Sequence, residues 1–168
     1  MSFEIIDTRF QEIERAIACH RYEDILVDPG PESSIHHVID ELGDLVPRVV
    51  LLTHVHLDHA GGTGRLVERY PDLQVYIHPD GLPHMVDPSR LIASATRIYG
   101  DQMDKWGDVI PVPEANIHAL EDGHFKDGVG QAHGPRNNPD YLAGDDDECD
   151  GAPTTTTTTT TKPPIGEQ

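Results

Sequence analysis

The sequence predicts an α/β domain followed by a disordered tail, and three observations lead to this prediction. Short apolar runs alternate with segments of helical periodicity from residue 3 to residue 127. The apolar run at 49–52 ends directly in a cluster of histidine and aspartate side chains, which the tip of a buried strand would present together. The apolar pattern stops after residue 127.

Strands are predicted where short apolar runs are bounded by turn residues, at Phe3–Asp7, 16–20, 24–28, 49–52 and 74–78. Helices are predicted at 33–46, 64–70 and 88–99. The apolar residues of the first helix recur at spacings of three and four and form one stripe: Ile35, Val38, Ile39, Leu42 and Leu45. This alternation of strands and helices is typical of an α/β domain.

The last 41 residues, 128–168, are poor material for a core. Only eight of them are hydrophobic, and they include an acidic run at 145–150 and an unbroken threonine run at 154–161. Such a stretch buries too little apolar area to offset the entropy cost of ordering it. The sequence therefore predicts a domain at 1–143 and a disordered low-complexity tail at 144–168.

Residues 53–62 carry the most informative motif of the chain, a His-x-His-x-Asp-His cluster followed by two glycines. His54 and His56 lie two apart, so they share a face if the strand geometry persists, whereas Asp58 and His59 follow in a turn that can aim at a second point nearby. Imidazole together with carboxylate suits zinc, and also iron or manganese. A lone histidine is more often a surface or core residue than a ligand, but this spacing predicts a metal site.

At this cluster the chain resembles the metallo-β-lactamase fold superfamily. Its alternating body and its Leu-Val-Asp-Pro-Gly-Pro turn look more like the glyoxalase II-like group than like secreted β-lactamases. The likeness extends from Phe3–Asp7 through the strand and turn at 25–30 and the metal segment at 48–62 to the strand at 74–79. It implies the N-terminal half of an αββα sandwich, whose metal ions lie at the seam between two βα halves.

The resemblance implies two ion positions. His54 and His56 match ligands of the first position, and Asp58 and His59 match ligands of the second. Asp28 matches an acidic residue that orients ligand imidazoles from behind. Asp28 also has a plain alternative, because an aspartate often starts an Asp-Pro-Gly turn.

The remaining ligands of the family would fall after residue 127. His133, which keeps a His-x-Pro spacing, is the candidate third ligand and is otherwise a loop histidine. The aspartate that bridges both ions in the family could only be Asp145, Asp146, Asp147 or Asp150. No histidine follows His133, so the terminal histidine of the second position has no match. Two explanations stay open: a natural short variant, or a reading frame or gene boundary disturbed near residue 128.

The net charge of the chain limits the kinds of molecule that it is expected to bind. A net charge of −18, from 30 acidic and 12 basic residues, disfavours nucleic acid and anionic membranes, which are bound through lysine and arginine. The two cysteines form no motif, the first residues show no signal-peptide pattern, and the longest purely apolar run has four residues. We therefore expect a soluble, cytoplasmic, acidic protein that acts on a small-molecule substrate, and a homodimer is left open.

The resemblance implies hydrolysis of a small ester, thiolester or lactone by a metal-bound hydroxide, with one or two zinc ions, or iron or manganese, as the cofactor. Asp58 is the candidate catalytic residue, because it would hold the second ion, orient the nucleophile and take up a proton. A second reading is a catalytically impaired fragment or metal-binding module that needs a partner chain, because the late ligands are missing. A third is a mononuclear iron dioxygenase of the same fold, so whether the chain is an enzyme stays open.

Overall fold

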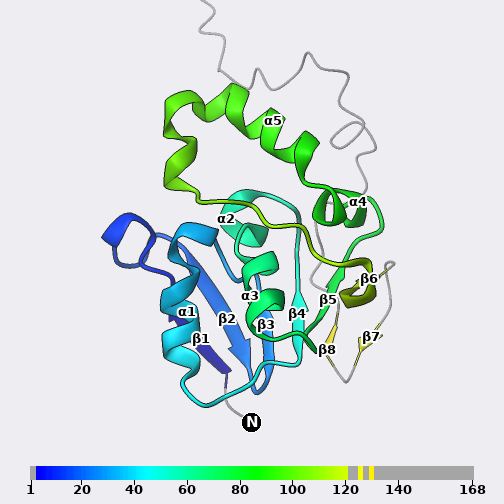
Figure 1. Cartoon of the computed structure of the whole chain (residues 1–168). Helices are drawn as coiled ribbons and strands as arrows, with labels where there is room; N and C mark the ends of the chain where they lie inside the picture. The colour runs from blue at the N-terminus through cyan, green and yellow to red at the C-terminus, as the bar shows by residue number, and fades with distance from the viewer. Residues whose placement is uncertain (1–2, 121–124, 127–128, 131–168) are drawn as a thin grey trace, which may run out of the picture. The chain divides into compact units, whose positions relative to one another are not determined.

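One mixed sheet of six strands, in the order β1-β2-β3-β4-β5-β6, organises the domain (Figure 1). A computed structural model describes residues 3–120, 125–126 and 129–130. The strands of this sheet are β1 Phe3–Asp7, β2 Ala18–Tyr22, β3 Ile25–Val27, β4 Val49–Leu51, β5 Gln74–Ile77 and β6 Ile117–Ala119. The first three strands pair antiparallel, and β3 to β6 pair parallel.

The helices come between the parallel strands, as α/β connections require. They are α1 Ile35–Leu42, α2 Leu57–Ala60, α3 Thr63–Arg69, α4 Leu82–Val86 and α5 Ser89–Tyr99. Short 3₁₀ turns lie at η1 Phe10–Glu12, η2 Glu32–Ser34, η3 Gly100–Lys105 and η4 Glu114–Asn116. Helices α1 and α3 lie on one face of the sheet (Figure 1), and none of the described helices is long and apolar enough to cross a membrane.

The central strands are buried on both faces, which explains why they read as continuous apolar runs rather than as alternating ones. On one face, the fully buried Leu26, Val50 and Val75 line up across β3, β4 and β5. On the other face, a separate cluster brings buried apolar residues of four segments together: Ile25, Val49, Leu51, Tyr76 and Leu120. The tip of β4 is therefore held from both sides.

The predicted α/β class is confirmed, and so are the strands at Phe3–Asp7, 24–28, 49–52 and 74–78 to within a residue at either end. The strand predicted at 16–20 is wrong by two residues, since β2 is Ala18–Tyr22. Its start is set by Asp7, whose carboxylate accepts hydrogen bonds from the backbone N–H groups of Arg9 and Arg15 and closes the preceding loop. Such a contact leaves no periodic trace in the sequence.

The helix predicted at 33–46 is too long at both ends. It begins with the 3₁₀ turn η2, and α1 ends at Leu42 because Gly43 adopts a φ of 55°, a left-handed value that ends the helix. The helices predicted at 64–70 and 88–99 are confirmed as α3 and α5. Strand β6 was not predicted. The boundary predicted at residue 143 and the tail predicted at 144–168 lie outside the described residues.

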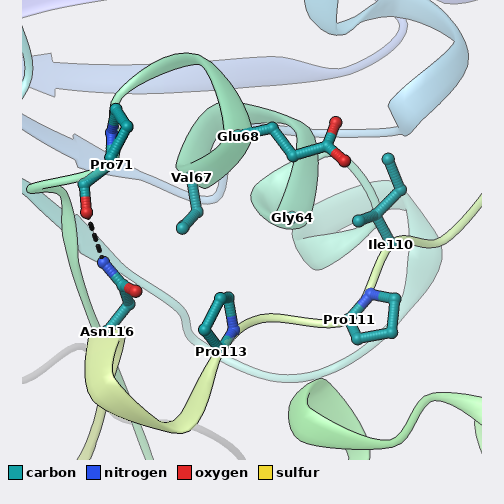
Figure 2. A pocket seen from close by; sticks show the side chains of 8 residues that line it. All are labelled: Gly64, Val67, Glu68, Pro71, Ile110, Pro111, Pro113 and Asn116. Atoms are coloured by element: carbon teal, nitrogen blue, oxygen red, sulfur yellow. Dashed lines mark hydrogen bonds between the residues drawn. The ribbon is translucent and has the colours of Figure 1, made fainter.

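The segment that leads into β6 packs against α3 and leaves a shallow groove of about 340 Å³ between them (Figure 2). Gly64 allows the close approach, because a Cβ at this position would lie 2.1 Å from the carbonyl oxygen of Ile110. At one end of the groove, Asn116 Nδ2 donates hydrogen bonds to the carbonyl oxygens of Pro71, at 2.8 Å, and Leu73, at 2.9 Å. Asn116 thus ties η4 to the loop before β5. A separate two-stranded ribbon is formed by β7 Phe125–Lys126 and β8 Val129–Gly130.

Replacing Asn116 by alanine should destabilise the fold. The side chain is only 9% exposed, so Asn116→Ala leaves two inward carbonyl oxygens without their donor, at an expected cost of about 2–4 kcal/mol in the free energy of unfolding. Urea denaturation measures this cost. Glu114→Ala, an exposed change in the same 3₁₀ turn, is the matched control and should shift stability by less than about 0.5 kcal/mol. Equal effects from both variants would contradict the prediction.

A second prediction concerns the buried thiol of Cys19 on β2. Burial, and then the nearby Asp28 charge, raise the pKa of Cys19 to about 12. This pKa lies above that of an unfolded thiol, about 8.5, so the unfolded chain loses the thiol proton first as the pH rises. The contribution of Cys19 to the free energy of unfolding is therefore complete below about pH 8.5 and is lost as the pH rises toward 12.

The measurement compares urea denaturation at pH 7 and pH 10, in a Cys149→Ser background. Between these pH values, the free energy of unfolding of the parent should fall by about 2 kcal/mol more than that of its Cys19→Ala derivative. If both proteins lose the same amount, the thiol is not the titrating group.

Candidate metal centre

The predicted metal cluster follows β4 at the edge where the parallel strands end. Strand β4 stops at Leu51, and residues 52–56 run on without regular structure into α2. The strand geometry therefore does not persist as far as His54 and His56, so it does not set the direction of their side chains. Val55 and Leu57 are buried instead, 6% and 4% exposed, and they anchor the segment while the intervening side chains stay accessible.

The two imidazoles of this segment nevertheless converge. The distance between His54 Nε2 and His56 Nδ1 is 3.1 Å, and the ring centroids are 4.5 Å apart in an edge-to-face arrangement. The ring of His59 lies beside that of His54, with 4.1 Å between centroids. The ring of His54 thus lies beside the rings of both other predicted histidines, His56 and His59.

Asp58 and His59 lie on the single-turn helix α2, rather than in the predicted turn. Within this helix, His59 Nε2 lies 3.3 Å from Asp58 Oδ2. The backbone carbonyl of His59 accepts a hydrogen bond from Gly30 N–H at 3.0 Å, and Gly62 N–H in turn donates to the Gly30 carbonyl at 2.8 Å. The turn after β3 therefore fixes α2 through the backbone as well as through side chains.

Asp28 lies beneath the cluster. It is 7% exposed, and its backbone has a left-handed φ of 50°, which aspartate tolerates better than most residues. One carboxylate oxygen, Oδ1, accepts a hydrogen bond from Thr53 N–H at 2.8 Å. The other, Oδ2, lies 2.7 Å from Thr53 Oγ1 and 2.9 Å from His59 Nδ1. Asp28 therefore contacts a predicted ligand directly, in addition to its place in the turn.

The charges of the site follow from these contacts. Burial opposes the ionisation of Asp28, but the hydrogen bonds from His59 and Thr53 outweigh it and hold the pKa of the carboxyl below its usual value. The hydrogen bond to Asp28, and then that to Asp58, raise the pKa of His59 to about 10. The hydrogen bond from His59 lowers the pKa of Asp58, so both carboxylates are charged at neutral pH. Burial, and then the neighbouring His59, lower the pKa of His54, which keeps that imidazole neutral.

The donor atoms fit a divalent cation in pairs. Two ligands of one tetrahedral zinc ion lie about 3.3 Å apart, close to the 3.1 Å between His54 Nε2 and His56 Nδ1 and the 3.3 Å between Asp58 Oδ2 and His59 Nε2. In the part of the chain that the structure describes, no three histidine, cysteine, aspartate or glutamate side chains are already arranged around one point. The geometry therefore supplies two converging pairs. His133 and the predicted bridging positions Asp145, Asp146, Asp147 and Asp150 lie outside the described residues.

Sequence reasoning missed Thr53. This half-buried residue links the Asp28 carboxylate to His54, because Thr53 Oγ1 also lies 2.9 Å from His54 Nδ1. A threonine before a histidine is too common to be informative alone. The usable signal was its place directly after the apolar run at 49–52, beside a neighbouring strand that is followed by an aspartate.

Comparisons with known proteins agree with the resemblance to the metallo-β-lactamase superfamily. A family profile described as the metallo-beta-lactamase superfamily matches residues 19–152. The hydroxyacylglutathione hydrolase of Xanthomonas euvesicatoria pv. vesicatoria is 46% identical over 111 residues, which are 62% of this chain and 40% of that protein. The enzyme of the same name from Hamiltonella defensa is 46% identical over 52 residues, 31% of this chain and 20% of that one. The chain thus spans less than half the length of these curated relatives.

Two solved structures are similar to part of the chain. MEM-A1, a subclass B3 metallo-β-lactamase from a soil metagenome library, is 24% identical with a TM-score of 0.48, over 73% of this chain and 44% of that one. TTHA1623, crystallised in a di-iron-bound form, is 32% identical with a TM-score of 0.42, over 66% of this chain and 53% of that one. The family profile covers most of the sequence, including the metal cluster and the turn beneath it. The chain therefore belongs to the metallo-β-lactamase superfamily.

Proposed function

We propose that the chain is a metal-dependent hydrolase that acts on a small ester, thiolester or lactone. The observation that carries this proposal is the pair of donor sets, His54 with His56 and Asp58 with His59, gathered over one buried carboxylate. Among the three substrate classes a thiolester is favoured, because the curated relatives are named for the hydrolysis of an acyl group carried on glutathione.

The cofactor fits the donor chemistry. Imidazole nitrogen with carboxylate oxygen is a ligand set for zinc, and iron and manganese accept the same atoms. The field at the site already favours positive charge, since Asp28 and Asp58 flank His59 from two sides. A bound divalent ion lowers the pKa of water from 15.7 to about 7 and so supplies a hydrolytic nucleophile at neutral pH.

The residues of the centre have different roles in this proposal. His54 and His56 hold the first ion position, and Asp58 and His59 hold the second. The side chain of Asp58 is 41% exposed, so it can face a substrate, and its lowered pKa keeps it ionised at neutral pH. Asp28 and Thr53 orient the imidazoles from beneath.

A second candidate, a metal-binding fragment completed by another chain, also has an observation in its favour. Among the described residues each donor set has two members, whereas zinc sites use three or four protein ligands. The chain also covers only 40% and 20% of two hydroxyacylglutathione hydrolases. The missing ligands would then come from a partner, and a second copy of this chain is one source.

Metal content and turnover separate the two candidates. Protein reconstituted with zinc, iron or manganese is assayed by elemental analysis and with a hydroxyacyl-glutathione thiolester. For the hydrolase, His56→Ala should lower kcat/KM by more than roughly 100-fold, since loss of an outer hydrogen-bond partner alone costs up to about that much. His36→Ala, an exposed histidine on α1, is the matched control and should leave turnover unchanged.

The outcomes point in different directions. One or two ions per chain with turnover that depends on His56 supports the hydrolase. Less than one ion per chain without turnover contradicts it and favours the fragment. An iron-loaded protein that consumes oxygen with a persulfide substrate, and hydrolyses no thiolester, would favour the iron dioxygenase of the same fold.

A further inference from the structure

Thr53 occupies the position between the buried carboxylate and the first pair of imidazoles. Its hydroxyl oxygen lies 2.7 Å from Asp28 Oδ2 and 2.9 Å from His54 Nδ1. Its backbone N–H donates to Asp28 Oδ1 at 2.8 Å, so main chain and side chain of the same residue clamp both carboxylate oxygens. The hydroxyl therefore has little freedom to turn elsewhere.

The direction of these hydrogen bonds follows from counting protons. An ionised carboxylate only accepts, and a threonine hydroxyl has one hydrogen to donate. Asp28 Oδ1 accepts from Thr53 N–H, and Oδ2 lies 2.9 Å from His59 Nδ1, so the carboxylate is the acceptor and the single hydroxyl hydrogen goes to Asp28 Oδ2. The lone pairs of Thr53 Oγ1 then face His54 Nδ1, which must carry a hydrogen for the 2.9 Å contact to be a bond.

We propose that Thr53 is a positioning residue that fixes the Nδ1–H tautomer of His54 and so leaves its Nε2 lone pair for a metal ion. This inference deepens the proposed function and rests on its first ion position. A histidine ligand commonly donates its other ring N–H to an oxygen acceptor, and this contact sets both the tautomer and the orientation of the ring. In this chain the acceptor is a hydroxyl that is itself polarised by a carboxylate.

The same carboxylate oxygen serves the other pair. Asp28 Oδ2 accepts from Thr53 Oγ1 and also lies 2.9 Å from His59 Nδ1, which leaves His59 Nε2 directed at Asp58. Asp28 thus orients His59 directly and His54 through Thr53. The Asp28 carboxylate thus supports both ion positions, and Thr53 connects it to His54 of the first position.

Two substitutions isolate the hydroxyl. Thr53→Val keeps the shape of the side chain and removes the hydroxyl, whereas Thr53→Ser keeps the hydroxyl and removes a methyl group. Thr63→Val is the matched control, because the hydroxyl of Thr63 is fully buried four residues beyond the cluster and has no hydrogen-bond partner among the described residues. Circular dichroism and urea denaturation of the metal-free proteins check that all three variants fold.

The first readout is the tautomer of His54 in the metal-free protein, from ¹⁵N–¹H spectra of histidine-labelled protein. The His54 signals are identified by their loss in His54→Gln. We expect the Nδ1–H form in the parent, in Thr53→Ser and in Thr63→Val, and a mixture with the Nε2–H form in Thr53→Val. A change in general stability alone would not move this ratio.

The second readout is zinc affinity, measured by competition with a chromophoric chelator. Thr53→Val should bind zinc about 10–100-fold more weakly than the parent, while Thr53→Ser and Thr63→Val should stay within about threefold. A parent protein with His54 in the Nε2–H form, or a Thr53→Val variant with unchanged tautomer and affinity, overturns the proposal. Because the tautomer is read without metal, a chain that binds no zinc would defeat the proposed function and still leave the role of Thr53 measurable.

Discussion

The hydrogen bonds to the buried Asp28 carboxylate are the constraint on which the candidate centre depends. Burying a charged carboxylate is costly unless its oxygens are paired, and here three donors from two segments pair them. Those donors can meet only because β3 and β4 are adjacent and parallel, so that their carboxyl ends open at the same edge of the sheet. The sheet topology, the burial of both its faces and the position of the metal cluster are therefore parts of one arrangement.

Close backbone approach completes this arrangement. Gly30 has a φ of 90°, and a Cβ on it would lie 2.8 Å from Thr8 Cγ2, so a larger residue would push the turn away from β1. This turn holds α2 through the Gly30–His59 hydrogen bond and the start of α3 through the Gly62–Gly30 hydrogen bond. The glycines after the cluster thus serve to bring the main chain of α2 and α3 against the turn that carries Asp28.

Much of the fold was predictable because central parallel strands read as short apolar runs, and β3, β4 and β5 all do. Strand β6 was missed because Ile117–Ala119 is only three residues long and includes a histidine. This residue, His118, forms a side-chain hydrogen bond with Gln74 of the adjacent strand β5. In the site, the spacing predicted that the four candidate ligands lie close together, but it did not predict what holds them there. Buried Val55 and Leu57, rather than a continued strand, turn the histidines outward, and the part of Thr53 depends on a contact across β3 and β4 that no local pattern records.

A protonated His59 places a positive charge between the two carboxylates of the metal-free centre. Two carboxylates, Asp28 and Asp58, face this imidazole, and their repulsion would oppose folding if nothing positive lay between them. A pKa of about 10 for His59 places a proton there at neutral pH, while neutral His54 keeps its own lone pair free of a proton that it would have to give up. A divalent ion held by His59 would take the place of this proton, so positive charge would lie between the carboxylates in either state. The hydrogen bonds that hold the metal-free site together are thus the ones that orient it for a cation.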